Sequence, residues 1–297
     1  MKHQVNCPLC EAQDYKTLYE PWVKVDDPVK LYGAASGIPG TQRLVRCRNC
    51  GMIYENPRYP DDVIFQGYAL SEEMGHDSQF AMRAESFYRA LGSLARLIPN
   101  PGAQVLDIGT AGGAFLEAAR RYGYDATGLE PSHYLAAQAK ARGLKIIEGT
   151  VYTQHLDEKS FDMICFWDVL EHVPNPKQDL IQIRKLLKPN GVLLINYPDI
   201  GTWMAKLTGK KFWWVTSVHL HHFTRATIKK LCDMAGYEVF YIKSYWQTLQ
   251  FGYLEHIATM YNIPLSRLLE RLTPTFIKNL SVSYYASQTT VLAKGKR

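Results

Sequence analysis

The stretch Val105-Leu-Asp-Ile-Gly-Thr-Ala-Gly-Gly-Ala-Phe-Leu116, followed by Ala126-Thr-Gly-Leu-Glu130, decides the fold. Its first four residues predict a short buried strand, its glycines predict a sharp turn, and a helix is expected over Phe115–Tyr122. Glycine suits the turn because the backbone must bend where a Cβ would collide with a ligand. A strand, a glycine turn, a helix and a strand that ends in a carboxylate form the first half of a nucleotide-binding Rossmann unit. Glu130 stands 17 residues after the last glycine, where a carboxylate can accept hydrogen bonds from ribose hydroxyls.

The glycine spacing indicates which nucleotide is bound. A dinucleotide fingerprint requires glycine at positions 111 and 114, and both are alanine. Asp107-Ile-Gly109-x-x-x-Gly113 instead resembles the first motif of class I S-adenosylmethionine (SAM)-dependent methyltransferases, which usually have a further glycine where Ala111 stands. SAM carries no phosphate, so the loop needs no ring of N–H donors, and Asp107 can organise the loop and favour the cationic ligand. The alternative is a generic tight turn of an α/β protein.

Later motifs extend the resemblance. Phe161–Trp167, Asp168-Val-Leu-Glu-His-Val173 and Leu186-Leu-Lys-Pro-Asn-Gly-Val-Leu-Leu194 are similar to the later motifs of the same superfamily. They are closest to its ubiquinone-type and glycan-type small-molecule enzymes. The resemblance covers residues 105–239 and implies a SAM site at the carboxyl ends of the strands, where open α/β sheets bind ligands. The cofactor-binding residues that it implies are Asp107, Gly109, Thr110, Ala111, Gly113, Glu130, Pro131, Thr150, Val151, Trp167 and Asp168. Tyr68 is expected as a lid residue over the cofactor, with an ordinary surface tyrosine as the alternative.

Histidines are the candidates for the catalytic step. Positioning supplies much of the rate of methyl transfer, and a hydroxyl acceptor also benefits from a base. His172 is one candidate, and a histidine that only holds its loop is the alternative. His219 and His222 belong to a second cluster, which follows the aromatic loop Phe212-Trp-Trp214. Plain packing is one alternative for this cluster. A second metal site is another, which is disfavoured because no carboxylate lies near the cluster in the sequence.

Two Cys-x-x-Cys pairs predict a metal site near the N-terminus. Cys7, Cys10, Cys47 and Cys50 have the spacing of a tetrahedral zinc site. Four thiolates close the coordination sphere, so the zinc is expected to be structural and not catalytic. Redox thiols or chance are the alternatives. Short strands are expected over 42–46 and 52–54 of this zinc ribbon.

Alternating strands and helices predict a parallel sheet with helices on both faces. The predicted fold class is an α/β, Rossmann-like seven-stranded methyltransferase sheet, with a small N-terminal zinc ribbon and a helical insertion before the last strand. The insertion is expected to be a cap over the acceptor site, a dimer face or a shallow membrane contact. The predicted divisions are a zinc ribbon over 1–60, a linker and helix over 61–100, and the methyltransferase domain over 101–297 with its insertion at 246–286. The expected elements are helices over 76–98 and 176–187, the latter stopped at 188–191, and strands over 145–148, 161–167, 192–198, 237–245 and 287–294.

Composition sets broad limits on partners. The 297 residues carry a formal net charge of +6 without a dense Lys/Arg block, so the sequence does not demand nucleic acid. No apolar run reaches the roughly 18 residues of a membrane helix, and the N-terminus lacks an apolar signal core. A cytoplasmic protein is therefore expected. The sequence does not indicate the oligomeric state.

A four-cysteine ribbon ahead of a SAM-binding core resembles the deoxysugar C-methyltransferases and related glycan-modifying enzymes. Those enzymes carry a further C-terminal domain for which this chain is too short, so O-methylation of a sugar or nucleotide-sugar is the leading expectation. Lys206, Lys210 and Lys211 could receive its phosphates or form a solvated face. The alternatives are a ribosomal RNA methyltransferase with a zinc knuckle, disfavoured by the wider cysteine spacing, and a non-catalytic SAM-binding scaffold.

Overall fold

The computed structural model of the chain describes residues 1–22, 27–33, 40–70, 80–260 and 264–296. The start of the helix predicted over 76–98 lies outside these ranges, as do residues 71–74 of the segment around Tyr68. Within them, no helix combines the length and the apolar character that crossing a membrane requires.

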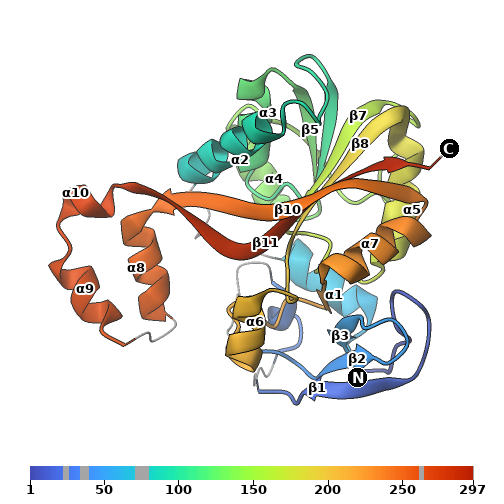
Figure 1. Cartoon of the computed structure of the whole chain (residues 1–297). Helices are drawn as coiled ribbons and strands as arrows, with labels where there is room; N and C mark the ends of the chain where they lie inside the picture. Colours follow the sequence, from blue (N-terminus) through green and yellow to red (C-terminus); the bar gives the residue numbers. More distant parts are fainter. Residues whose placement is uncertain (23–26, 34–39, 71–79, 261–263, 297) are drawn as a thin grey trace.

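A seven-stranded sheet in the order β10-β11-β8-β7-β4-β5-β6 forms the centre of the molecule (Figure 1). The strands β6, β5, β4, β7 and β8 run parallel to one another, whereas β11 runs antiparallel to both β8 and β10. The strands are β4 (Gln104–Ile108), β5 (Asp125–Glu130), β6 (Lys145–Glu148), β7 (Phe161–Trp167), β8 (Leu187–Pro198), β10 (Tyr237–Gln250) and β11 (Ser281–Gly295). This is the predicted α/β class and sheet.

Helices cover both faces of this sheet. Successive side chains of a strand point to opposite faces. In β7, Met163 and Cys165 accordingly pack with α2 and α3, whereas Ile164 and Phe166 pack with α5 and α7. The helices around the sheet are α1 (Asp61–Ala69), α2 (Phe80–Leu94), α3 (Ala114–Tyr122), α4 (His133–Ala141), α5 (Pro176–Leu186), α6 (Trp203–Thr208) and α7 (Arg225–Met234). The helix predicted over 176–187 ends at Leu186, and residues 188–191, which were predicted as its stop, already belong to β8, which begins at Leu187.

A second sheet joins the N-terminal segment to the rest of the chain. Its order is β1-β2-β3-β9, from β1 (Tyr15–Tyr19), β2 (Leu44–Cys47), β3 (Ile53–Glu55) and β9 (His221–His222). The strand β9 pairs antiparallel with β3, with Ile53 opposite His222 and Tyr54 opposite His221. The predicted ribbon of residues 1–60 therefore shares its sheet with a strand from the predicted methyltransferase domain.

The last two strands extend beyond the body as a two-stranded arm. Their pairing continues to Gln250 and Ser281, so the strands predicted over 237–245 and 287–294 were too short. Three helices lie at the tip, α8 (Phe251–Met260), α9 (Ser266–Leu272) and α10 (Thr275–Lys278). Figure 1 shows them away from the main sheet. The helical part of the predicted 246–286 insertion is therefore confined to the arm tip, between the paired strand ends.

Candidate active site

A cavity of 540 Å³ opens at the carboxyl ends of β4, β5 and β7. Its volume lies within the range of about 300–1,000 Å³ that is usual for small-ligand sites. Within the described part of the chain, every residue that the sequence assigned to SAM lines it except Gly113. The residues concerned are Tyr68, Asp107, Gly109, Thr110, Ala111, Glu130, Pro131, Thr150, Val151, Trp167 and Asp168.

The glycine loop explains why Gly113 is needed although it does not line the cavity. Gly113 has a φ of +86° and is the N-cap residue of α3, and a Cβ there would lie 2.4 Å from Leu144 Cδ1. Gly109 has a φ of +66°, and its Cβ would lie 2.8 Å from a methyl carbon of Val169. Ala111, where the usual family pattern has glycine, also has a positive φ, of 50°. Ala111 thus adopts the left-handed conformation that glycine adopts more readily.

Two carboxyl groups lie at the ends of neighbouring strands. Glu130 accepts hydrogen bonds from the backbone N–H groups of Ala111 (2.8 Å) and Ser132 (2.9 Å), which fix its carboxylate beside the loop. Asp107 is only 2% exposed, and its Oδ1 atom has no hydrogen-bond partner among the described residues. Burial raises the pKa of Asp107 to about 8, and the charge of Glu130 adds to the effect. A buried acid with an unsatisfied oxygen of this kind favours a cationic ligand.

Asp168 and Trp167 close the opposite wall of the cavity. Asp168 has a φ of +56°, and its Oδ1 accepts hydrogen bonds from Asn196 (2.9 Å) and Gln288 (2.7 Å). The Trp167 ring packs against Phe87, with ring centroids 4.9 Å apart, and is also in contact with Phe115 and Tyr245. This wall is therefore held by residues from helices and strands that lie far apart in the sequence.

Two of the three candidate histidines reach the cavity. His172 Nδ1 lies 3.1 Å from the carbonyl oxygen of Val218, and His219 Nδ1 lies 2.8 Å from that of Trp214. A carbonyl oxygen only accepts, so each Nδ1 carries the proton and each Nε2 carries a lone pair. Tyr68, on α1, donates a hydrogen bond to the same Val218 carbonyl (3.3 Å) and packs its ring edge-on against His172.

The structure places His222 differently from the other two. His222 lies in β9, outside the residues that line the cavity, and its ring centroid is 6.0 Å from that of His219. Burial lowers the pKa of His222 to about 3. Its strand pairing with Ile53 holds it in the second sheet, and this contact with the N-terminal segment could not be deduced from the spacing of the histidines.

Glu171 is a member of the site that the sequence analysis passed over. Its carboxylate and ring nitrogens of His172 and His219 lie within 4.8 Å of one another. The side chain is 1% exposed, and neither carboxylate oxygen has a hydrogen-bond partner among the residues that the structure describes. The sequence contained a signal for this residue, because Glu171 directly precedes the candidate His172. No carboxylate lies near the His219 cluster in the sequence, but in the structure the Glu171 carboxylate lies beside it.

Further aromatic rings line the cavity. They come from α1, from the 212–214 loop, from the arm strands and from the start of α8, and they are Phe65, Trp213, Trp214, Tyr245, Tyr253 and Tyr284. The arm thus contributes to the cavity through its strands and the first turn of α8, whereas Leu268, Leu272 and Phe276 at its tip are exposed. Lys206, Lys210 and Lys211 are also exposed and do not belong to the described cavity lining, so the phosphate contacts expected of them have no place in it.

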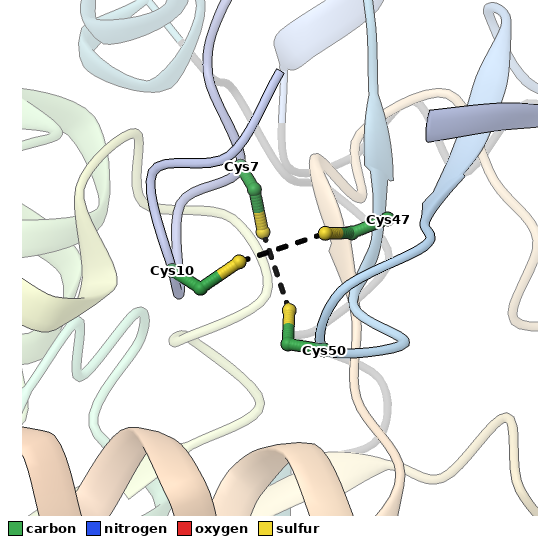
Figure 2. A group of neighbouring side chains, drawn as sticks. All are labelled: Cys7, Cys10, Cys47 and Cys50. Atoms are coloured by element: carbon green, nitrogen blue, oxygen red, sulfur yellow. Dashed lines mark hydrogen bonds between the residues drawn. The ribbon is translucent and has the colours of Figure 1, made fainter. Parts of the chain in front are cut away.

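The four cysteines converge at one point (Figure 2). Cys7 Sγ lies 3.4 Å from Cys50 Sγ, and Cys10 Sγ lies 3.6 Å from Cys47 Sγ. Sulfurs bound to one tetrahedral zinc at about 2.3 Å are about 3.8 Å apart, so the group fits that ion with little movement. Both knuckles have the same backbone, because Glu11 and Gly51 follow their cysteine pairs with φ values of 63° and 77°. The remaining cysteines, Cys165 and Cys232, are buried as expected.

The chain is similar in sequence to methyltransferases. A family model described as a methyltransferase domain matches residues 82–242. The ubiquinone biosynthesis O-methyltransferase of Actinobacillus pleuropneumoniae is 31% identical over 162 residues, which are 48% of this chain and 69% of that protein. The protein of the same name from Xanthomonas campestris is 32% identical over 113 residues, 36% of this chain and 47% of its own length.

Solved structures show the same fold. A chain of the complex between the Haloferax volcanii Trm112 methyltransferase activator and a methyltransferase superposes with a TM-score of 0.53 at 18% identity, covering 76% of this chain and all (100%) of that one. A SAM-dependent methyltransferase from Archaeoglobus fulgidus gives a TM-score of 0.52 at 16% identity, covering 75% of this chain and 100% of that one. The chain therefore belongs to the methyltransferase-domain family and is a class I SAM-dependent methyltransferase.

Proposed function

We propose that the chain methylates a hydroxyl group of a small molecule whose ring binds among the aromatic side chains of the cavity. One observation carries the proposal: a single cavity joins the glycine loop, the His172–His219 pair and the aromatic wall. SAM supplies the methyl group on a cationic sulfur, which becomes a neutral thioether when the acceptor oxygen takes the methyl carbon.

The residues of β4 and β5 suit the SAM end of the cavity. We assign the ribose hydroxyls to Glu130, whose carboxylate is already fixed by two backbone donors. Asp107 would favour the cationic part of the ligand and hold the loop. Thr150 and Val151 would line the adenine, and Tyr68 would cover the cofactor from α1.

The histidine pair would hold and activate the acceptor hydroxyl. His172 and His219 each keep Nδ1 on a backbone carbonyl, which leaves Nε2 as the acceptor. Burial lowers the pKa of His219 well below its usual range, and the neighbouring His172 and His222 lower it further. A neutral imidazole at neutral pH can accept a hydrogen bond from a hydroxyl group. His222, outside the cavity lining, would support His219 and not meet the acceptor.

The aromatic wall makes a phenolic ring our leading acceptor. Two relatives are named ubiquinone biosynthesis O-methyltransferases, which fits an aromatic hydroxyl better than the sugar expected from the ribbon. A sugar remains the second candidate because Trp213 and Trp214 could stack on its apolar face. The four cysteines would hold a structural zinc that supports the second sheet.

The test incubates the protein with methyl-labelled SAM and two acceptor panels, one of catechols and other phenols and one of sugars and nucleotide-sugars. We expect transfer to phenolic hydroxyls, and a large loss of kcat with retained SAM binding in His172→Ala and His219→Ala. Transfer to the sugar panel alone would reverse the choice of acceptor. Ribosomal RNA is incubated in the same way. Transfer of the methyl label to this RNA, or SAM binding without transfer to any acceptor, would reject the proposal.

A further inference from the structure

We infer that Glu171, His172 and His219 form a second divalent metal site, at the wall of the acceptor cavity and separate from the four cysteines. The four-cysteine group and this one are the two clusters of metal-ligand side chains found among the described residues. The inference rests on the proposed function only for the role of the ion, since binding itself follows from the side chains.

The donor atoms are close enough for one ion. Atoms bound to one metal at about 2.0–2.2 Å are at most about 4.4 Å apart. A carboxylate oxygen of Glu171 and one ring nitrogen from each histidine lie within 4.8 Å of one another, which is close to this limit. The two rings meet edge to face with centroids 4.7 Å apart.

The protonation states of the histidines also favour a metal. Nδ1 of His172 and Nδ1 of His219 each donate to a backbone carbonyl, at 3.1 and 2.8 Å. Metal-binding histidines typically donate their other ring nitrogen in this way, which fixes the tautomer and raises the basicity of the ligating nitrogen. Both Nε2 lone pairs are therefore in the state that coordination requires.

Glu171 supplies the observation that most needs explanation. An ionised carboxylate that is 1% exposed, with no hydrogen-bond partner for either oxygen among the described residues, is costly unless a cation or proton accompanies it. Asp168, the neighbouring acid, differs because Asn196 and Gln288 donate to it.

The donor set selects the kind of metal. Two imidazoles and one carboxylate suit Zn²⁺ or another first-row divalent ion, and imidazole nitrogen is a poor ligand for Mg²⁺. Three protein ligands leave at least one coordination position open, which is typical of catalytic and not of structural sites. Because His172 and His219 line the cavity, the open position would face the acceptor. With the ion bound, the Nε2 lone pairs would be used in coordination, and the ion instead of the imidazoles would hold and polarise the acceptor oxygen.

The test counts metal. The full chain is equilibrated with Zn²⁺ in the presence of excess Mg²⁺, desalted, and analysed for zinc per chain by mass spectrometry. We expect two zinc ions in the wild type and one in Glu171→Gln, matching the two clusters. His219→Gln should behave like Glu171→Gln, and His222→Gln, a matched control in the same histidine cluster, should keep both ions.

Folding and function are checked separately. Circular dichroism and SAM binding establish whether each variant is folded. If one ligand variant does not fold, His172→Gln is used in its place. We expect at least about a 10- to 100-fold weaker affinity for the second zinc in the ligand variants. One zinc in the wild type that is retained in Glu171→Gln and His219→Gln, or two in every folded ligand variant, would overturn the inference. Two zinc ions with no transfer to phenols would leave the site standing and reject only the proposed acceptor.

Discussion

Asp107 is a single carboxyl group whose protonation should control cofactor binding. Burial raises its pKa to about 8 in the free protein, so near neutral pH it is mostly protonated. A cationic ligand favours the ionised form and lowers this pKa, so binding must release a proton below about pH 8. We expect SAM affinity to rise by up to about tenfold per pH unit between about pH 6 and 8 and then to level off. Calorimetry at several pH values would detect this slope. Asp107→Asn should bind more weakly with a flat profile, and a flat wild-type profile would contradict the assignment.

Gly113 and Gly112 make a matched pair for the glycine loop. Gly113 has a positive φ, and a Cβ there would lie 2.4 Å from Leu144, whereas a Cβ on Gly112 would meet nothing closer than 3.6 Å. We expect Gly113→Ala to lower the free energy of unfolding by about 1–3 kcal/mol, with Gly112→Ala within about 1 kcal/mol of the wild type. Urea unfolding measures both values. Equal losses would mean that backbone strain at Gly113 is not what requires glycine.

The residues of the site were predictable where a motif holds them together and were missed where only the fold does. Asp107 and Glu130 belong to one strand–turn–helix–strand unit, so the spacing between them carries the information. Glu171 and His219 are 48 residues apart, and they meet because the backbone N–H of His221 bonds to the carbonyl of Glu171. No local pattern encodes a contact of that kind.

At the scale of elements, β3 and β9 couple the proposed zinc ribbon to the acceptor site. β3 pairs with β9, which begins two residues after His219, and β2 ends at Cys47. We expect Cys47→Ser to weaken zinc binding, loosen the second sheet and lower kcat for methyl transfer at least about tenfold. SAM affinity should change little, because β4 and β5 lie in the other sheet.

The control for this prediction is Arg48→Ala, in the same knuckle. Arg48 forms an ion pair with Asp14 in which both side chains are more than 60% exposed, at 61% and 74%, and such surface pairs contribute little. Both variants are measured by zinc content, by calorimetry with SAM and by methyl transfer. A loss of SAM binding equal to the loss of transfer in Cys47→Ser would refute this local coupling.

Elements were predicted best where burial is continuous on both faces. The strand predicted over 161–167 has the observed bounds of β7, since it lies in the middle of the sheet and reads as one apolar run. The strands β10 and β11 were predicted too short because their outer halves extend beyond the main sheet, where buried residues such as Thr248 and Leu249 are adjacent and do not alternate with exposed ones. Strand β9 has only two residues, too few for any periodicity.

At the scale of the whole molecule, body and arm tip differ in how they are stabilised. In the body, Leu106, Leu180 and Leu193 are fully buried in a core shared by both sheets. At the tip, Leu268, Leu269 and Leu272 are 53%, 58% and 69% exposed. We expect Leu180→Ala to lower the free energy of unfolding by about 2–5 kcal/mol and Leu268→Ala to change it by less than about 0.5 kcal/mol. Urea unfolding separates the two cases, and a large loss in Leu268→Ala would mean that the tip is packed in solution.

Removing the arm tip tests whether it belongs to the SAM site, to the acceptor site or to neither. Gln250 and Ser281 are directly paired, so an Asn-Gly hairpin turn can join them in place of residues 251–280 without altering the strands. The body should remain folded and bind SAM with unchanged affinity, because β4 and β5 hold the proposed cofactor residues. The KM for the acceptor should rise several-fold, since Tyr253 is lost from the cavity wall while Tyr284 stays.

Tyr253→Ala in the full chain is the matched point variant and should reproduce most of that rise. An unchanged KM in both variants would exclude the arm from acceptor binding, and a loss of SAM affinity in the shortened chain would show that the tip supports the cofactor end of the cavity.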